Sequence, residues 1–230
     1  MPSVQTVAST SFQRHSALGF QDVSVVPLRS RALVAYLQER GIPAQIAVAN
    51  CRQIHYSCRS KRYYAVAFAN QSNGFEMRNR YFKGCIAPKD ISIRRVRDGP
   101  STECAVFEGF FDYLSALTLG IINGADAIIL NSVSNVNKAI PILKDYTVIN
   151  CYLDNDNAGE TALAELTAIY GSTVIYRSTL YSGFNDLNEY LKHQSFTTRL
   201  NDYENRQSST YIGIAVNQVD RCNRQSSINS

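Results

Sequence analysis

The second half of the chain alternates short apolar runs with longer amphipathic segments. The apolar runs predict buried strands at 103–109, 126–132, 147–154 and 172–177. Between and after them, apolar residues recur with the period of a helix at 110–120, 137–145, 158–171 and 185–193. Strands and helices that alternate in this way form a parallel sheet covered by helices on both faces. This half therefore predicts an α/β fold.

The first half follows a different pattern, in which one helix precedes several strands. A helix is predicted over 31–41, where Ser30 suits the N-cap and Gly41 suits the end. Strand-like segments lie at 44–49, 52–57, 63–70 and 74–82, and a short strand enters a basic connector at 85–97. The sequence QSNG at 71–74 predicts a hairpin turn. We expect a smaller α+β subdomain ahead of the α/β domain.

Changes in composition divide the chain into four parts. Residues 1–20 are rich in Ser, Thr and Gln, and residues 194–230 are rich in Ser, Asn, Gln and Arg, so both ends are expected to be flexible. The sequence DGP at 98–100 marks a boundary between a subdomain at 21–100 and a domain at 101–193.

The charge changes sign at the same boundary. Lys and Arg outnumber Asp and Glu by ten in residues 1–100, whereas Asp and Glu outnumber Lys and Arg by seven in residues 101–194. The net charge of +4 conceals this division. A basic half is suited to contact with a polyanion, and an acidic half is suited to holding cations.

Acidic residues collect where the predicted strands end. Glu108 ends the first strand of the α/β half, and Asp154 and Asp156 end the third. Asp112 lies in the first turn of the helix after Glu108, and Asp186 begins the last helix. Functional groups of an open α/β sheet gather beyond the carboxyl ends of its strands. Carboxylates grouped there suit Mg²⁺, which takes hard oxygen ligands and would offset the repulsion between neighbouring aspartates.

The segment LDNDNAG at 153–159 has a second interpretation as the start of a calcium loop. Counted from Asp154, Gly159 and Glu165 stand where that loop requires Gly and Glu. Against it, the residues ETALAE at 160–165 favour a helix. Each acidic residue alone also suits a solvated strand end or a helix cap. The group as a whole favours magnesium.

Three motifs resemble the Toprim domain, which bacterial-type primases share with type IA and type II topoisomerases and some nucleases. FEGFFD at 107–112 is similar to its glutamate motif, and LDNDNAG at 153–159 is similar to its D-x-D-x-x-G motif. FNDLNEYL at 184–191 resembles a segment of primases. In this chain Asn188 stands where the primase segment has an aspartate. The resemblance covers residues 101–193 and implies a Toprim-type sheet with Mg²⁺ or Mn²⁺ as cofactor.

The resemblance also implies roles for the acidic residues. Glu108 would be a general acid/base or a metal-linked residue, and Asp154 and Asp156 would be the principal metal ligands, so these three would be catalytic. Asp112 and Asp186 would be outer ligands or ligands of a second metal. The asparagine at 188 puts a fully acidic second or third metal site in doubt.

The basic half carries a candidate nucleic-acid surface. NGFEMRNRYFKG at 73–84 interleaves aromatic residues with Arg78, Arg80 and Lys83, and Lys89 follows. Such residues hold the phosphates of a strand while aromatic rings stack on its bases. A solvated sheet face is the alternative. The segment resembles the basic ridge beside the metal site of primase cores.

The resemblance is to a primase core without its N-terminal zinc ribbon, because the six cysteines include no C-x-x-C pair. No zinc is expected; Cys51, His55 and Cys58 form only a weak local cluster. The N-terminal residues lack the apolar core of a secretory signal, and no apolar run is long enough to cross a membrane. A cytoplasmic protein without a membrane partner is expected.

Taken together, these features favour a primase-like nucleotidyltransferase that makes short primers on single-stranded DNA from nucleoside triphosphates. The layout of residues 30–193 resembles small Toprim-containing primase-like proteins of Bacteroides-type bacteria and their mobile elements, which suggests a replicative helicase or a relaxase as a partner. A Toprim nuclease and a non-catalytic nucleic-acid-binding module of a mobile element are the alternatives.

Overall fold

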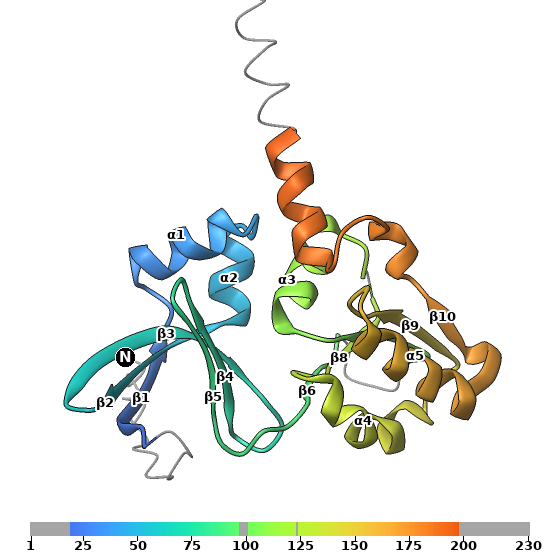
Figure 1. The fold of residues 1–230 in the computed structure, drawn as a ribbon, viewed down its shortest axis with the longest axis horizontal. Helices are drawn as coiled ribbons and strands as arrows, with labels where there is room; N and C mark the ends of the chain where they lie inside the picture. Colours follow the sequence, from blue (N-terminus) through green and yellow to red (C-terminus); the bar gives the residue numbers. More distant parts are fainter. Residues whose placement is uncertain (1–18, 97–100, 123, 198–230) are drawn as a thin grey trace, which may run out of the picture. The chain divides into compact units, whose positions relative to one another are not determined.

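The computed structural model describes residues 19–96, 101–122 and 124–197. Within these ranges the chain forms two five-stranded sheets (Figure 1). The first is an antiparallel meander in which each strand pairs with the next in chain order. Its strands are β1 (Gln21–Pro27), β2 (Arg52–Cys58), β3 (Lys61–Ala69), β4 (Phe75–Asn79) and β5 (Phe82–Ile86).

Two helices between β1 and β2 cover one face of this sheet, α1 (Arg31–Glu39) and α2 (Ala44–Asn50). The Ser30 hydroxyl accepts a hydrogen bond from the Leu33 backbone and caps α1, as predicted, and Gly41 follows the helix with a φ of 80°. Leu33 and Leu37 of α1 share a buried core with Phe68 of β3.

Residues 44–49 form helix α2, so the predicted strand there is wrong. The run is rich in alanine, the residue with the highest intrinsic helix propensity. Pro43 occupies the N-cap with extended backbone angles, and only Ala47 is fully buried within the helix. A short apolar run of this kind fits the period of a strand and of a helix equally well, and the Pro43 cap favours the helix.

The predicted strand at 74–82 is two strands joined by a tight turn. β4 ends at Asn79 and β5 begins at Phe82. The Asn79 side chain accepts a hydrogen bond from the Tyr81 backbone, which closes a turn that contains neither Gly nor Pro. The turn predicted at 71–74 is confirmed, since it joins β3 to β4 and Asn73 adopts a φ of 60°. Strand β1 was not predicted.

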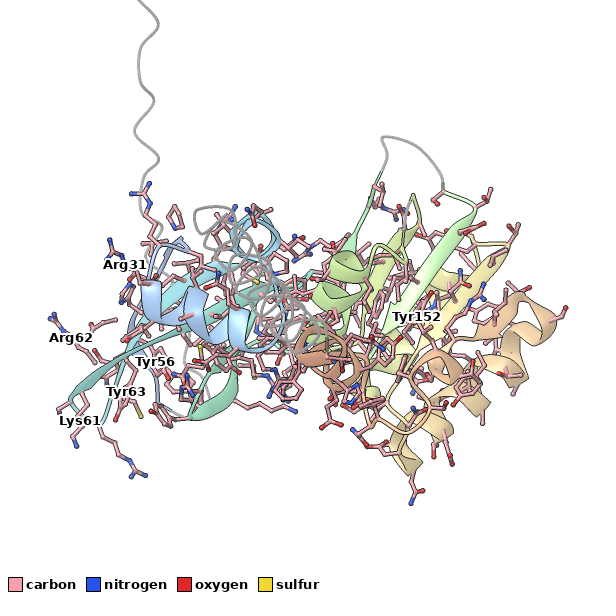
Figure 2. All side chains as sticks on the ribbon, turned by 90° about the horizontal axis from the view of Figure 1, so that it is seen from above. Arg31, Tyr56, Lys61, Arg62, Tyr63 and Tyr152 are labelled. Carbon is pink, nitrogen blue, oxygen red and sulfur yellow. The ribbon has the colours of Figure 1, made fainter. Side chains whose placement is uncertain are left out.

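The hairpin between β2 and β3 carries basic and aromatic side chains at its end. Arg59 and Ser60 both have positive φ, as a two-residue hairpin turn requires. Lys61 follows them, and the rings of Tyr56 and Tyr63 stack with centroids 5.5 Å apart (Figure 2).

The second sheet confirms the predicted α/β class. Its strand order is β10-β9-β7-β8-β6, with parallel pairing except between β6 and β8. The strands are β6 (Ser92–Arg94), β7 (Glu103–Phe107), β8 (Asp126–Ile129), β9 (Val148–Tyr152) and β10 (Val174–Tyr176). The helices between them are α3 (Phe110–Leu119), α4 (Val136–Leu143) and α5 (Asn157–Tyr170). The chain is helical again from residue 187.

Helices cover both faces of the second sheet. Side chains of β7 alternate between two cores: Phe107 packs with Leu114 of α3, whereas Val106 packs with Leu143 of α4 and Leu166 of α5. Alternation along a strand sends neighbouring side chains to opposite faces, so each core fills one face. The parallel sheet is therefore buried between helices, as its apolar strands predict.

One of the hydrophobic cores contains residues of both sheets. Phe68 of β3 stacks on Phe110 of α3 with centroids 5.1 Å apart, and the Arg94 guanidinium lies over the Phe68 ring. The described residues through Leu191 belong to one compact unit. In the described part of the chain, no helix has the length and apolar character needed to cross a membrane.

Candidate active site

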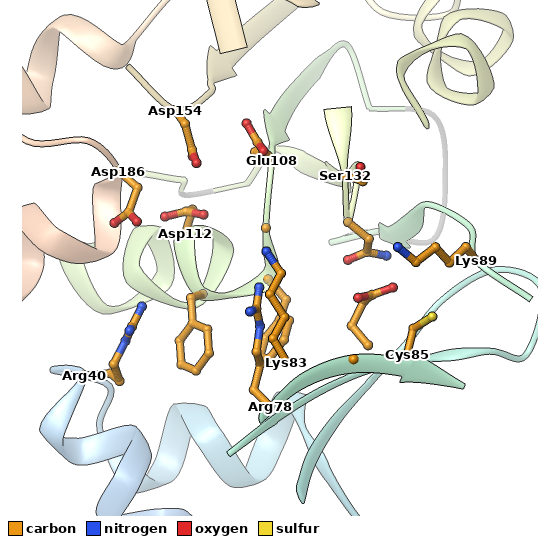
Figure 3. A pocket seen from close by; sticks show the side chains of 16 residues that line it. Arg40, Arg78, Lys83, Cys85, Lys89, Glu108, Asp112, Ser132, Asp154 and Asp186 are labelled. Carbon is orange, nitrogen blue, oxygen red and sulfur yellow. The ribbon is translucent and has the colours of Figure 1, made fainter. Parts of the chain in front are cut away.

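A pocket of about 620 Å³ lies where β4 and β5 face the carboxyl ends of β7, β8 and β9 (Figure 3). Pockets of this size are typical of sites for small molecules. Both sheets contribute side chains, so the pocket combines the acidic and the basic parts of the chain.

Four predicted acidic residues line one end of the pocket. Glu108 follows β7, Asp112 lies in the first turn of α3, Asp154 follows β9, and Asp186 directly precedes the last described helix. Figure 3 shows their side chains directed toward the same space. The sheet topology explains this convergence, because β7 and β9 are parallel neighbours that end at the same edge.

Two glycines allow the backbone to pack closely beside these carboxylates. A Cβ at Gly159 would lie 2.1 Å from the Asp154 carbonyl oxygen, so any larger residue would displace α5 or the Asp154 loop. Gly109 is the N-cap of α3, and a Cβ there would lie 3.2 Å from the Asp112 carboxylate. Close packing of the backbone therefore explains why a glycine stands at this position in each of the two motifs.

Burial and mutual repulsion make the acidic end electrostatically unfavourable for the protein alone. Burial, followed by the charges of Asp112 and Glu108, raises the pKa of Asp154 to about 8. Burial and the charge of Asp186 raise the pKa of Asp112 to about 7. The pKa of Glu108 is also raised, mainly by burial and then by Asp156. A cation among these groups would remove the penalty.

Asp156 plays a different local role from its neighbours. Its Oδ1 accepts hydrogen bonds of 2.9 Å from the backbone of Ala158 and Gly159, which makes it the N-cap of α5. It does not belong to the pocket lining, although its charge acts on Glu108. Because the chain is helical from Asn157, residues 154–165 do not form the twelve-residue calcium loop, and that alternative is wrong.

Asn188 is a buried connection between the two halves of the unit rather than a member of the pocket lining. Its backbone donates to Asp112 Oδ1 at 3.2 Å. Its side-chain amide donates to the Arg40 carbonyl and to the Ser115 hydroxyl, both at 2.9 Å. The asparagine thus joins the end of α1 to α3 and helps to fix Asp112.

The other side of the pocket is basic. Arg78, Lys83 and Lys89 line it, whereas Arg80 lies outside the lining and forms an exposed ion pair with Glu39. Side chains alternate along β4 and β5, and cross-strand pairing sets Arg78 opposite Lys83.

Arg40 also lines the pocket and places its guanidinium 4.6 Å from the centre of the Phe111 ring. We did not predict Arg40, because nothing at the end of an amphipathic helix indicates which pocket it faces.

Glu76 and Cys85, from the same face of β4 and β5, and Asn131 and Ser132, after β8, complete the opposite end. None of these four was predicted. The period of two along β4 and β5 could have indicated Glu76 and Cys85, since they share a face with Arg78 and Lys83.

The donor types at the acidic end fit a hard cation such as Mg²⁺. Glu108 Oε2 is buried and accepts no hydrogen bond from any described residue. Across the described ranges, no group of three or more His, Cys, Asp or Glu side chains is arranged to hold a metal ion. Mg²⁺ needs only one or two carboxylates in addition to water and phosphate oxygens, so the types of residue present suit it.

Comparisons with known proteins agree with this geometry. Residues 105–191 match the family model described as Toprim-like, and residues 22–87 match a domain of unknown function, DUF8464. A search of the curated proteins finds no match.

Among solved structures, the chain is similar to the primase fragment of the bacteriophage T7 primase-helicase protein, with 16% identity and a TM-score of 0.53 over 86% of this chain and 79% of that one. It is also similar to a bacteriophage T7 complex of the lagging-strand DNA polymerase with primase domains bound to an RNA/DNA hybrid and dTTP, with 18% identity and a TM-score of 0.52 over 74% of this chain and 88% of that one. At these identities the likeness establishes the fold: a Toprim-like domain in a primase-like arrangement.

Proposed function

We propose that this protein is a primase-like nucleotidyltransferase that joins nucleotides on a single-stranded DNA template. One observation carries the proposal: a single pocket holds strand-end carboxylates from the Toprim-like domain at one end and lysine and arginine from the first sheet beside them. Phosphoryl transfer needs charge of both kinds, because the cation and the basic side chains act together on phosphate oxygens.

Glu108, Asp154 and the free oxygen of Asp156 are the candidate ligands of Mg²⁺, and Asp112 and Asp186 are candidates for an outer or second position. When bound, Mg²⁺ would neutralise the triphosphate and stabilise charge that develops on the transferred phosphoryl group. Arg78 and Lys83 would bind phosphate oxygens of the nucleotide or the template. Asn188 would keep Asp112 in place through its backbone hydrogen bond.

The test is primer synthesis on single-stranded DNA with nucleoside triphosphates and Mg²⁺. Asp154→Asn should reduce the rate by about 100-fold or more, because it removes a charge that holds the cation. Asp145→Asn is the matched control, since Asp145 is exposed and outside the pocket lining, and it should leave the rate unchanged. Synthesis by Asp154→Asn at the wild-type rate would contradict the proposal.

The same incubation without nucleoside triphosphates separates the alternatives. Mg²⁺-dependent cleavage of the DNA, lost in Asp154→Asn and accompanied by no primer synthesis, would assign the pocket to a nuclease instead. DNA binding without either reaction would assign the protein to non-catalytic binding.

A further inference from the structure

The end of the pocket away from Asp154 and Asp186 contains two buried oxygen atoms that lack partners. Glu76 is only 7% exposed, and its Oε1 receives no hydrogen bond within the described ranges. The Oδ1 atom of Asn131 is likewise buried with no donor from the described residues. Figure 3 shows Cys85, Lys89 and Ser132 at this end. Glu76 pairs across the strands with Cys85 and Asn131 directly precedes Ser132, which assigns both to the same end of the pocket lining.

The orientation of the Asn131 amide is fixed by its surroundings. Its nitrogen donates to the Asp90 carbonyl at 2.8 Å and to the Ser92 hydroxyl at 2.9 Å. The Ser92 hydroxyl donates its hydrogen bond to the Ala69 carbonyl, so it can only accept a hydrogen bond from Asn131. Both neighbours therefore require the nitrogen, and the oxygen is left as the remaining acceptor.

The position of Glu76 is fixed by the sheet. It pairs across the strands with Cys85 and Phe68, and Arg78 lies two residues further along the same face of β4. Burial raises the pKa of Glu76, and the positive charges of Lys89, Arg78 and Lys83 partly oppose this. A side chain held in this way costs stability unless something hydrogen-bonds to it.

Two unpartnered acceptors in one pocket call for a ligand with two neighbouring donors. The ribose of a nucleotide offers two adjacent hydroxyl groups, and a carboxylate that accepts from a ribose hydroxyl is a recurring element of nucleotide sites. Figure 3 shows Arg78 and Lys83 between this end and the carboxylates. A triphosphate reaching toward the acidic end past these two side chains would leave its sugar near Glu76.

We infer that Glu76 and Asn131 form a ribose subsite, in which their free oxygens accept hydrogen bonds from the 2′- and 3′-hydroxyl groups of a nucleoside triphosphate. This inference rests on the proposed function and adds to it a selection of ribonucleotides over deoxyribonucleotides. Neither residue needs to take part in the chemistry.

The test is equilibrium binding of adenosine triphosphate and its 2′-deoxy and 3′-deoxy analogues in the presence of Mg²⁺, measured by calorimetry. Each analogue should bind the wild type about tenfold more weakly, which is the order expected for one hydrogen bond to a charged or buried acceptor. Glu76→Met keeps the side-chain volume but removes the acceptor. It should bind one of the two analogues as tightly as adenosine triphosphate, because the hydroxyl that this analogue lacks has no acceptor left in the variant. It should still bind the other analogue, whose missing hydroxyl pairs with Asn131, about tenfold more weakly than adenosine triphosphate.

Two further variants give the controls. Glu76→Gln retains a carbonyl oxygen and should recover part of the discrimination, whereas Glu103→Gln alters an exposed carboxylate outside the pocket lining and should retain all of it. Thermal unfolding provides a second readout: Glu76→Met should not lower Tm, since it removes an unsatisfied buried group. A lower Tm together with uniformly weaker binding of all three triphosphates would mean that Glu76 is structural.

The outcomes separate this inference from the proposed function. Equal binding of all three triphosphates by the wild type would overturn the ribose subsite and leave primer synthesis untouched. Undiminished discrimination against both analogues by Glu76→Met would also overturn it. If no triphosphate binds and no primer forms, both proposals fail together.

Discussion

Asp126 and Asp154 are acidic residues beside the parallel strands of the same sheet, yet their environments are opposite. Asp126 begins β8 and is fully buried. Its Oδ2 accepts from Arg95 at 3.0 Å and from the Tyr146 hydroxyl at 2.9 Å, and its Oδ1 accepts from the Val96 backbone at 3.1 Å. Asp154 follows β9 at the carboxyl ends of the strands, where the charged groups around it are mainly other carboxylates.

The difference indicates which charges serve the fold and which serve a ligand. A buried carboxylate with several donors holds its surroundings together, whereas buried carboxylates that face one another cost stability until a cation or a proton arrives. The satisfied acid lies at the amino ends of the parallel strands, and the unsatisfied acids lie at the carboxyl ends, where open α/β sheets bind ligands.

The largest effect is expected at the satisfied acid. Asp126→Asn should lower the free energy of unfolding by about 3 kcal/mol, because it weakens the ion pair and sets an amide group against the buried Tyr146 hydroxyl. The ion-pair part of this loss is modest, since the Arg95 side chain is 54% exposed. Urea denaturation measures the change, and a loss below the error of the fit would contradict the assignment.

A smaller effect, of about 2 kcal/mol, is expected when the pH of the wild-type protein is raised from 5 to 8 in a chelator. Asp154 and Asp112 have folded-state pKa values of about 8 and about 7, above the unfolded value near 4, so the folded state binds more protons across this range. Stability should therefore fall as the pH rises. Burial is the largest cause of both raised pKa values, and the neighbouring carboxylates, among them Glu108 and Asp186, add to it. Denaturation curves at several pH values test the sign, and a rise between pH 5 and 8 would contradict it.

Asp154→Asn should raise stability, in contrast to Asp126→Asn. At pH 8 without divalent cations, we expect a gain of about 1 kcal/mol, discounted for the partial exposure of the site. The variant should also show a shallower decline with pH than the wild type. Urea denaturation in chelator measures both. A destabilised Asp154→Asn protein would place Asp154 in the same structural class as Asp126.

The smallest effect is expected from magnesium itself. At a concentration three times its dissociation constant, Mg²⁺ should stabilise the wild type by about 0.8 kcal/mol. The gain should be absent in Asp154→Asn and unchanged in Asp126→Asn. Thermal unfolding with and without Mg²⁺ measures it, with Na⁺ at matched ionic strength as the control. An equal gain in all three proteins would indicate a general salt effect.

The sequence predicted the second sheet better than the first for a physical reason. Buried parallel strands are continuous apolar runs bounded by helices with glycine stops, such as α3 with Gly120. The first sheet depends on features that the sequence pattern indicates less clearly. They include an Asx-type turn at Asn79 and a short helix whose apolar run also suits a strand.

The same distinction applies to the site. The strand-end rule predicted Glu108 and Asp154 because the sheet alone places them. It did not predict that Asp156 would cap α5, since a cap and a ligand share the same residue types. Arg40 and Asn131 could not be predicted from local pattern, because they reach the pocket only when the two sheets pack together. Glu76 could have been indicated by the period of two along β4, since it shares a face with Arg78.

Strand β6 limits how this chain can be divided for experiments. It lies before the change in composition at 98–100, yet it hydrogen-bonds to β8 as the outer strand of the second sheet. A fragment that started at residue 101 would expose the backbone of β8 as a new sheet edge and uncover the apolar side chain of Ile128 nearby. Such a fragment should aggregate, so an excised Toprim-like domain needs a start before Ile91.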